Sequence, residues 1–126
     1  MYKIHTLEHH ILVKFEADFT CQSIRAIIRH ETAIPEYLRW NDIWMIGKHH
    51  SSISLPDFET MTAEFNCMCP RNAPRKKTAV VINQGLTEAI VQLWIKQLGN
   101  KIPFEIRIFH TLAEAESWLG VVAKVV

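Results

Sequence analysis

The stretch that decides the fold runs from Lys77 to Leu119 and reads KTAVVINQGLTEAIVQLWIKQLGNKIPFEIRIFHTLAEAESWL. Val80, Val81 and Ile82 follow one another without the alternation of a half-exposed strand, which is typical of a strand covered on both faces, as in a parallel sheet. The hydrophobic spacing predicts two strands that alternate with two helices, at 78–82, 86–98, 104–109 and 111–119. No cluster of residues in this stretch specifies a reaction.

Upstream of it, the pattern predicts a hairpin, two further helices and one more strand. The hairpin falls within 3–16, one helix follows the N-cap residue Thr20 and ends before Pro35, a strand covers 43–46, and another helix follows Ser54. The resulting order is β-β-α-β-α-β-α-β-α. Such alternation predicts an α/β fold with a mixed, mostly parallel sheet of about five strands and about four helices. The strand at 104–109 alternates apolar and charged residues, so we expect it near a sheet edge.

The composition indicates one ordinary globular domain spanning 1–126. Hydrophobic residues make up 48% and charged residues 21% of the chain, and the net charge is +1. This balance gives no reason to expect binding to nucleic acid. No apolar run reaches the roughly 20 residues of a membrane span. Three cysteines without a disulfide pattern favour a reducing compartment, and we expect a cytoplasmic protein.

The element order and four local features resemble the SpoIIAA-like family of small bacterial proteins, which has the STAS fold. These features are the apolar strand after Asn41-Asp42, the basic segment before Thr78–Ile82, the strand Ile106–Phe109 and the ending Ala113–Leu119. The ending has the form Phe-x-x-x-x-x-Ala-x-x-Trp-Leu, in which a capped helix lays Ala115, Trp118 and Leu119 onto the sheet.

The resemblance implies a non-enzymatic binding or regulatory module rather than a catalyst. Anti-sigma factor antagonists of the STAS fold bind a partner kinase and are switched by phosphorylation of a serine at the start of the helix after the third strand. The matching segment here is Ser51-Ser52-Ile53-Ser54-Leu55. A candidate partner loop with a phospho-switch therefore comprises His49, Ser51, Ser52 and Ser54, and we expect Ser52 or Ser54 at or just before the first turn of that helix.

A second hypothesis comes from the similarity of this family in fold to CRAL-TRIO lipid-binding domains. It implies a carrier or sensor of a small apolar, lipid-like molecule. The helix at 86–98 has an apolar arc far wider than packing on one sheet requires. Its excess surface, which includes Val91, Trp94 and Ile95, favours a homodimer contact or a ligand groove. The alternative is cover by another helix of the same domain, with the closing helix and its Trp118 as the candidate.

Metal binding and catalysis have weaker support in the sequence. His9-His10, His49-His50 and Cys67-Met68-Cys69 lack the spacing of a structural zinc site, so we expect no metal and no cofactor. Hydrolysis would have to use Ser52 or Ser54 with His49 and Asp42, but the nucleophile elbow Gly-x-Ser-x-Gly is absent. The basic residues Arg71, Arg75, Lys76 and Lys77 are interpreted as a solvated loop beside an apolar strand.

Overall fold

The computed structural model describes residues 2–7, 10–37, 39–50, 53–68, 76–83, 85–98 and 104–120. The elements, in chain order, are β1 (Tyr2–Thr6), β2 (His10–Phe15), α1 (Cys21–Thr32), β3 (Asn41–Gly47), α2 (Leu55–Met68), β4 (Lys76–Ile82), α3 (Gly85–Leu98), β5 (Phe104–Phe109) and α4 (Leu112–Leu119). The predicted order of strands and helices is confirmed. The basic residues Arg71 and Arg75 lie outside the described residues.

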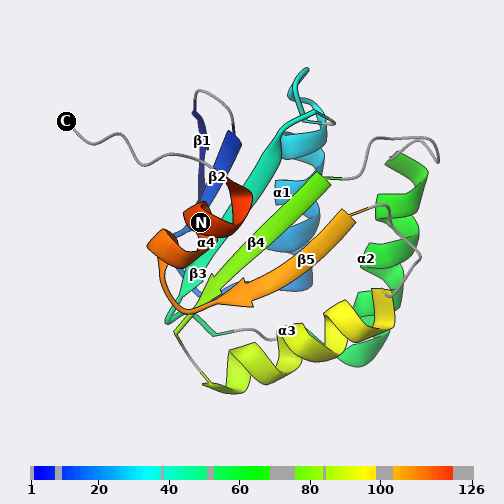
Figure 1. The fold of residues 1–126 in the computed structure, drawn as a ribbon. Helices are drawn as coiled ribbons and strands as arrows, with labels where there is room; N and C mark the ends of the chain where they lie inside the picture. Colours follow the sequence, from blue (N-terminus) through cyan, green and yellow to red (C-terminus); the bar gives the residue numbers. More distant parts are fainter. Residues whose placement is uncertain are drawn as a thin grey trace.

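The five strands form one sheet in the order β1-β2-β3-β4-β5 (Figure 1). Only β1 and β2 are antiparallel, and every other neighbouring pair is parallel. The α/β class with a mixed, mostly parallel sheet is thus confirmed, and β5 lies at an edge of the sheet as predicted. In the register, Asp42 of β3 lies opposite Thr78 of β4, which in turn lies opposite Ile106 of β5.

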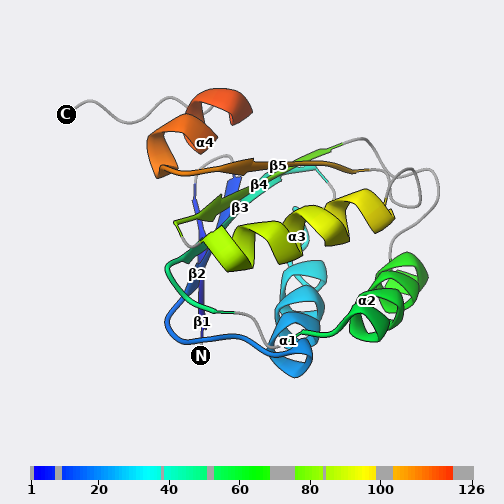
Figure 2. The same ribbon diagram turned by 90° about the horizontal axis from the view of Figure 1, so that it is seen from below.

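The helices divide unequally between the two faces of the sheet. Right-handed crossovers between strands that follow one another in the sheet place their helices on the same face. Figure 2 shows α1, α2 and α3 on one face and α4 alone on the other. The larger core includes Val13, Ile27, Trp44 and Val80, whereas a smaller core forms under α4 from Ile43, Ala79, Val81 and Ala115.

Capping residues fix the ends of α1 and α4. Thr20 caps α1: its hydroxyl accepts a bond from the Ser23 backbone N–H (3.2 Å), and the Ser23 hydroxyl accepts from the Thr20 N–H (2.8 Å). Thr111 caps α4 by accepting from the Glu114 backbone N–H (3.2 Å), and the Glu114 carboxylate accepts from the Thr111 hydroxyl (2.9 Å). Helix α4 ends at Gly120, whose φ of +73° suits glycine.

Two expectations about positions were wrong. Strand β4 begins at Lys76 rather than at residue 78, and Lys76 is only 4% exposed, so it belongs to the core and not to a solvated loop. Trp118 does not cover α3, because α4 and α3 lie on opposite faces of the sheet (Figure 2).

Within the described part of the chain, no helix is both long and apolar enough to cross a membrane.

Candidate functional site

The loop after β3 is held firmly where it leaves the sheet. Gly47 takes a φ of +63°, which turns the chain away from the strand at little cost for glycine. Its carbonyl accepts a bond from the Asn83 backbone N–H (2.7 Å), and the hydroxyl of Thr87 in α3 donates to the His49 carbonyl (3.2 Å). The loop is therefore tied to the end of β4 and to the start of α3.

A second set of bonds ties the same loop to the segment before α1. The Asp18 carboxylate accepts from the His50 backbone N–H (2.9 Å), and the Phe19 N–H donates to the His50 carbonyl (3.0 Å). The Asp18 carboxylate also lies 3.7 Å from Nδ1 of His49. The His50 side chain is exposed and that of His49 is half-buried. The predicted loop thus presents one exposed histidine from a backbone fixed on three sides.

Ser54 lies directly before the first residue of α2 and is exposed. Its backbone N–H donates to the Asp57 carboxylate (3.0 Å), and the Asp57 N–H donates to the Ser54 carbonyl (3.1 Å). The bonds from Ser54 lower the pKa of Asp57, because they stabilise the ionised carboxylate. The predicted position at a helix start is confirmed for Ser54, whereas Ser51 and Ser52 lie outside the described residues.

The groups considered for hydrolysis do not come together. Asp42 is the second residue of β3, whereas His49 follows the opposite end of that strand. The five steps along the strand from Asp42 to Gly47 span about 16 Å at ~3.3 Å per residue. Asp42 also faces the buried side of the sheet, where it is 2% exposed. Asp42 and His49 therefore cannot act on one substrate atom in this arrangement.

The structure turns most of the predicted apolar surface of α3 inward. Val91 is buried, and the Trp94 ring stacks on Phe58 of α2 with centroids 5.9 Å apart and planes 10° apart. Ile95 is half-buried. Among the described side chains of α3, the exposed large apolar ones are instead Leu86 (67%) and Leu93 (51%). Cover by a helix of the same domain is present, but it comes from α2.

A small apolar cavity lies among these side chains, between the sheet and the helices. Trp44, Ile46, Phe58, Val91 and Trp94 are among its lining residues. Its free volume is about 10 Å³, which is the space of about one water molecule. The helices would have to separate before a lipid-like molecule could enter here.

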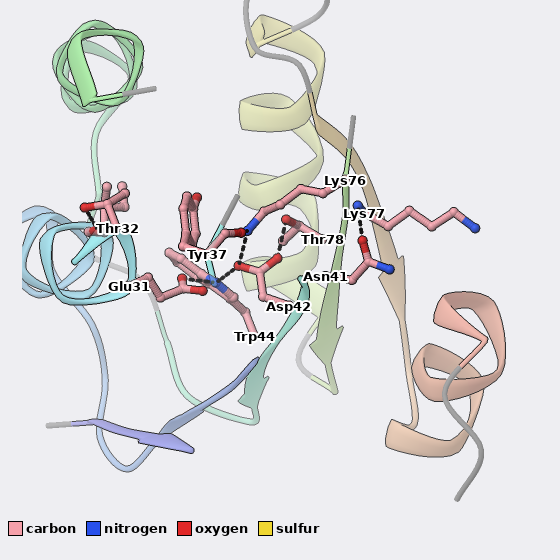
Figure 3. Close-up of polar contacts among 10 residues, drawn as sticks. Glu31, Thr32, Tyr37, Asn41, Asp42, Trp44, Lys76, Lys77 and Thr78 are labelled. Atoms are coloured by element: carbon pink, nitrogen blue, oxygen red, sulfur yellow. Dashed lines mark hydrogen bonds and ion pairs between the residues drawn. The ribbon is translucent and has the colours of Figure 1, made fainter. Parts of the chain in front are cut away.

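A buried polar network lies on the same face of the sheet, at the amino-terminal ends of β3 and β4 (Figure 3). Asp42 is its centre: one carboxylate oxygen accepts from the Thr78 hydroxyl (2.5 Å), and the other lies 3.2 Å from Nε1 of Trp44 and 3.8 Å from Nζ of Lys76. The same indole N–H donates to the Glu31 carboxyl (2.9 Å). All of these side chains are buried, so salt and solvent screen their charges much less than at the surface.

Lys76 has further partners on the side away from Asp42. Its ammonium donates to the Tyr37 carbonyl (3.1 Å) and lies 3.4 Å from the centroid of the Tyr37 ring. The Phe104 ring is 4.9 Å away. Ion pairing, a hydrogen bond and aromatic rings together compensate for the loss of water around a buried ammonium group.

Glu31 is the third ionisable group of the network, and its pKa is strongly shifted. Burial raises its pKa well above the ordinary value of 4.5, and the nearby Asp42 charge and a hydrogen bond with Asp42 act in the same direction. Lys76 and Trp44 oppose the shift. One Glu31 oxygen, Oε2, is buried without a hydrogen-bond partner. A protonated Glu31 leaves one buried anion, Asp42, facing one buried cation, Lys76.

This raised pKa predicts that stability depends on pH through Glu31. The folded state holds the proton more tightly than the unfolded chain, so the contribution of Glu31 is full below about pH 4.5 and is lost as the pH rises through the folded-state pKa. Glu31→Gln keeps the shape and cannot ionise. We expect the stability of Glu31→Gln, relative to the wild type, to rise with pH in urea titrations from about pH 5 to 9. Parallel curves for the two proteins would contradict the assignment.

The comparisons with known proteins add no relative. No family model, no curated protein and no solved structure matches the chain.

Among the residues that the structure describes, no group of three or more His, Cys, Asp or Glu side chains is placed to hold a metal ion.

Proposed function

We propose that this chain is a non-enzymatic, cytoplasmic binding module of the SpoIIAA-like type, which binds a protein partner through the loop from His49 to Ser54. The observation that carries the proposal is the position of Ser54: an exposed hydroxyl at the start of α2, beside a loop with a fixed backbone. The backbone of His49 and His50 is held by hydrogen bonds and the His50 side chain is exposed. A fixed and exposed segment at the end of a buried strand is suited to recognition, because little entropy is lost when a partner binds it.

The surroundings of Ser54 also supply a physical basis for a switch. A phosphate on its hydroxyl would place close to two negative charges at the start of α2, where backbone N–H groups and the helix dipole favour an anion. The Asp57 carboxylate already lies at this helix start, where it accepts a hydrogen bond from the Ser54 N–H. The phosphate and the Asp57 carboxylate would repel each other, so phosphorylation would replace the cap and change the charge of the surface offered to the partner.

Site-specific photo-cross-linking in the source cells tests the binding face. A photoreactive phenylalanine analogue replaces His50, whose side chain is exposed in the loop. The matched control carries the analogue at Arg39, which is also exposed but precedes β3 at the other end of the strand. We expect a covalent adduct with another protein from position 50 and none from position 39.

Two outcomes would contradict this proposal. One is an adduct from position 39 with none from position 50, which would move the binding face to the other end of the sheet. The other is equal labelling from both positions, which would indicate random encounters. Circular dichroism of both substituted proteins checks that the fold is unchanged.

A further inference from the structure

The outer edge of β5 has no neighbouring strand among the described residues (Figure 1). Strand β5 pairs with β4 on one side only, over the residues Phe104 to Phe109. An edge of this length offers backbone N–H and C=O groups to another strand. Natural edge strands avoid such pairing when their side chains repel a second strand, so the side chains of β5 decide whether a copy can bind.

The two faces of β5 carry different side chains. Glu105 and Arg107 lie on the face of α4, where the Arg107 guanidinium is 3.1 Å from the Glu105 carboxylate and 5.3 Å from the Trp118 ring. Their side chains are 45% and 58% exposed. Phe104, Ile106 and Ile108 lie on the other face, where all three belong to the larger core or pack against it.

We propose that two copies of this chain pair antiparallel through β5, with Ile106 on the two-fold axis. Residues directly opposite each other in an antiparallel pair lie on the same face of the sheet. In this register Glu105 lies opposite Arg107 of the second copy, and Arg107 lies opposite its Glu105. On the other face Phe104 lies opposite Ile108, and Ile106 meets its own copy. Both faces are self-complementary, and the sheet continues from one copy into the other.

Neighbouring registers lack this complementarity. A shift of one residue places Glu105 opposite Ile108 and Arg107 opposite Ile106. An axis on Arg107 brings two arginines together, and an axis on Glu105 brings two glutamates together, which is unfavourable in a sheet. The charges therefore select one register.

The other edge of the sheet lacks such a match. Pairing of β1 about Ile4 would place Lys3 opposite His5 of the copy, so each cation faces a group that can only be neutral or positive. Lys3 is also engaged by Glu16, 3.5 Å away. Charge complementarity thus points to β5 and to a second copy as its occupant. A shallow hollow of about 370 Å³, lined by Gln92, Ile95, Lys96, Arg107 and Ile108, lies between α3 and β5.

Charge-swap variants of the full chain test this dimer in sedimentation equilibrium. We expect the wild type to be dimeric, and Arg107→Glu and Glu105→Arg each to weaken the dimer at least about tenfold, because like charges then face each other twice. An equimolar mixture of the two variants restores a dimer, and so does the double variant Glu105→Arg/Arg107→Glu. Both side chains are exposed, so the melting temperature of each variant should stay close to that of the wild type.

Three results would overturn the inference. The first is a wild type that stays monomeric up to near-millimolar concentration. The second is a dimer that none of the charge swaps weakens, which would place the contact elsewhere. The third is a full chain that is monomeric when a chain ending at Gly120 is dimeric, because residues 121–126 would then occupy the edge. All of these measurements use the purified protein alone, so they are independent of the proposed partner loop.

Discussion

Replacing Lys76 with methionine is expected to lower the free energy of unfolding by about 3–5 kcal/mol, because the change leaves a buried charge without its partner. The Asp42 carboxylate, 2% exposed, would lose the ammonium group 3.8 Å away. The Tyr37 carbonyl would lose a hydrogen bond, and the Tyr37 and Phe104 rings would lose the cation between them. Urea unfolding followed by circular dichroism measures the effect.

The matched control is Lys14→Met, since Lys14 is exposed on β2. We expect it to change stability by no more than about 0.5 kcal/mol. In the double variant Asp42→Asn/Lys76→Met both charges are removed, so its loss should be smaller than the sum of the two single losses. A Lys76→Met protein as stable as Lys14→Met, or strictly additive losses, would show that the ion pair does not hold the core.

Replacing Trp94 with alanine is expected to cost about 3 kcal/mol, the lower end of the range for large aromatic residues in cores, because the side chain is half-buried. The Trp94 ring stacks on Phe58, which is 2% exposed, and it lines the apolar cavity between α3, α2 and the sheet. Truncation would enlarge that cavity and remove the contact that joins α2 to α3. Denaturant titration gives the loss in stability.

Leu93 provides the control from the same helix, because its side chain is 51% exposed. We expect Leu93→Ala to stay within about 0.5 kcal/mol of the wild type. The opposite result is a Trp94→Ala protein of nearly wild-type stability that loses its dimer or a co-purifying apolar molecule. It would support the homodimer contact or ligand groove predicted at Trp94.

The order of elements could be predicted from the sequence because each element has its own local pattern. Continuous apolar runs identify β3 and β4 as strands covered on both faces, and alternation identifies β5 as an edge. Capping residues fix the starts of α1 and α4. All of these signals lie within a few residues of one another, so the tertiary structure was not needed to interpret them.

The buried network does not follow from residue type, because lysine and glutamate are expected at the surface of a protein. It follows only from the positions of Lys76 and Glu31 in the apolar patterns. Lys76 is two residues before Thr78 and four before Val80, so the period of the strand places it on the same inner face. Glu31 follows Ile24, Ile27 and Ile28 at helical spacing and falls on the buried side of α1. Extending each apolar pattern by one step would have indicated both residues.

The direction of the apolar arc on α3 could not be decided in the same way. Periodicity shows which side chains of a helix share a face, but it does not show which neighbour covers that face. The wide arc of α3 is divided between the sheet, Phe58 of α2 and solvent, so Val91 is buried, Trp94 is half-buried against Phe58, and Leu86 and Leu93 are exposed. That division follows from the placement of α2, which depends on contacts distant in sequence, including the bonds of Glu64 with Arg25 (2.5 Å) and Arg29 (2.8 Å) of α1.

The measurement that tests the proposed function most directly is the affinity of the partner captured at position 50 for chains that carry phosphoserine at a single site. Phosphoserine at 54 is expected to change Kd by about tenfold or more, which corresponds to about 1.4 kcal/mol. Phosphoserine at 117, on an exposed position of α4 on the other face of the sheet, should leave Kd within about twofold of the unmodified chain. Equal affinities for the unmodified chain and for both phosphorylated chains would contradict the switch at Ser54 and, with it, the proposed role of this loop.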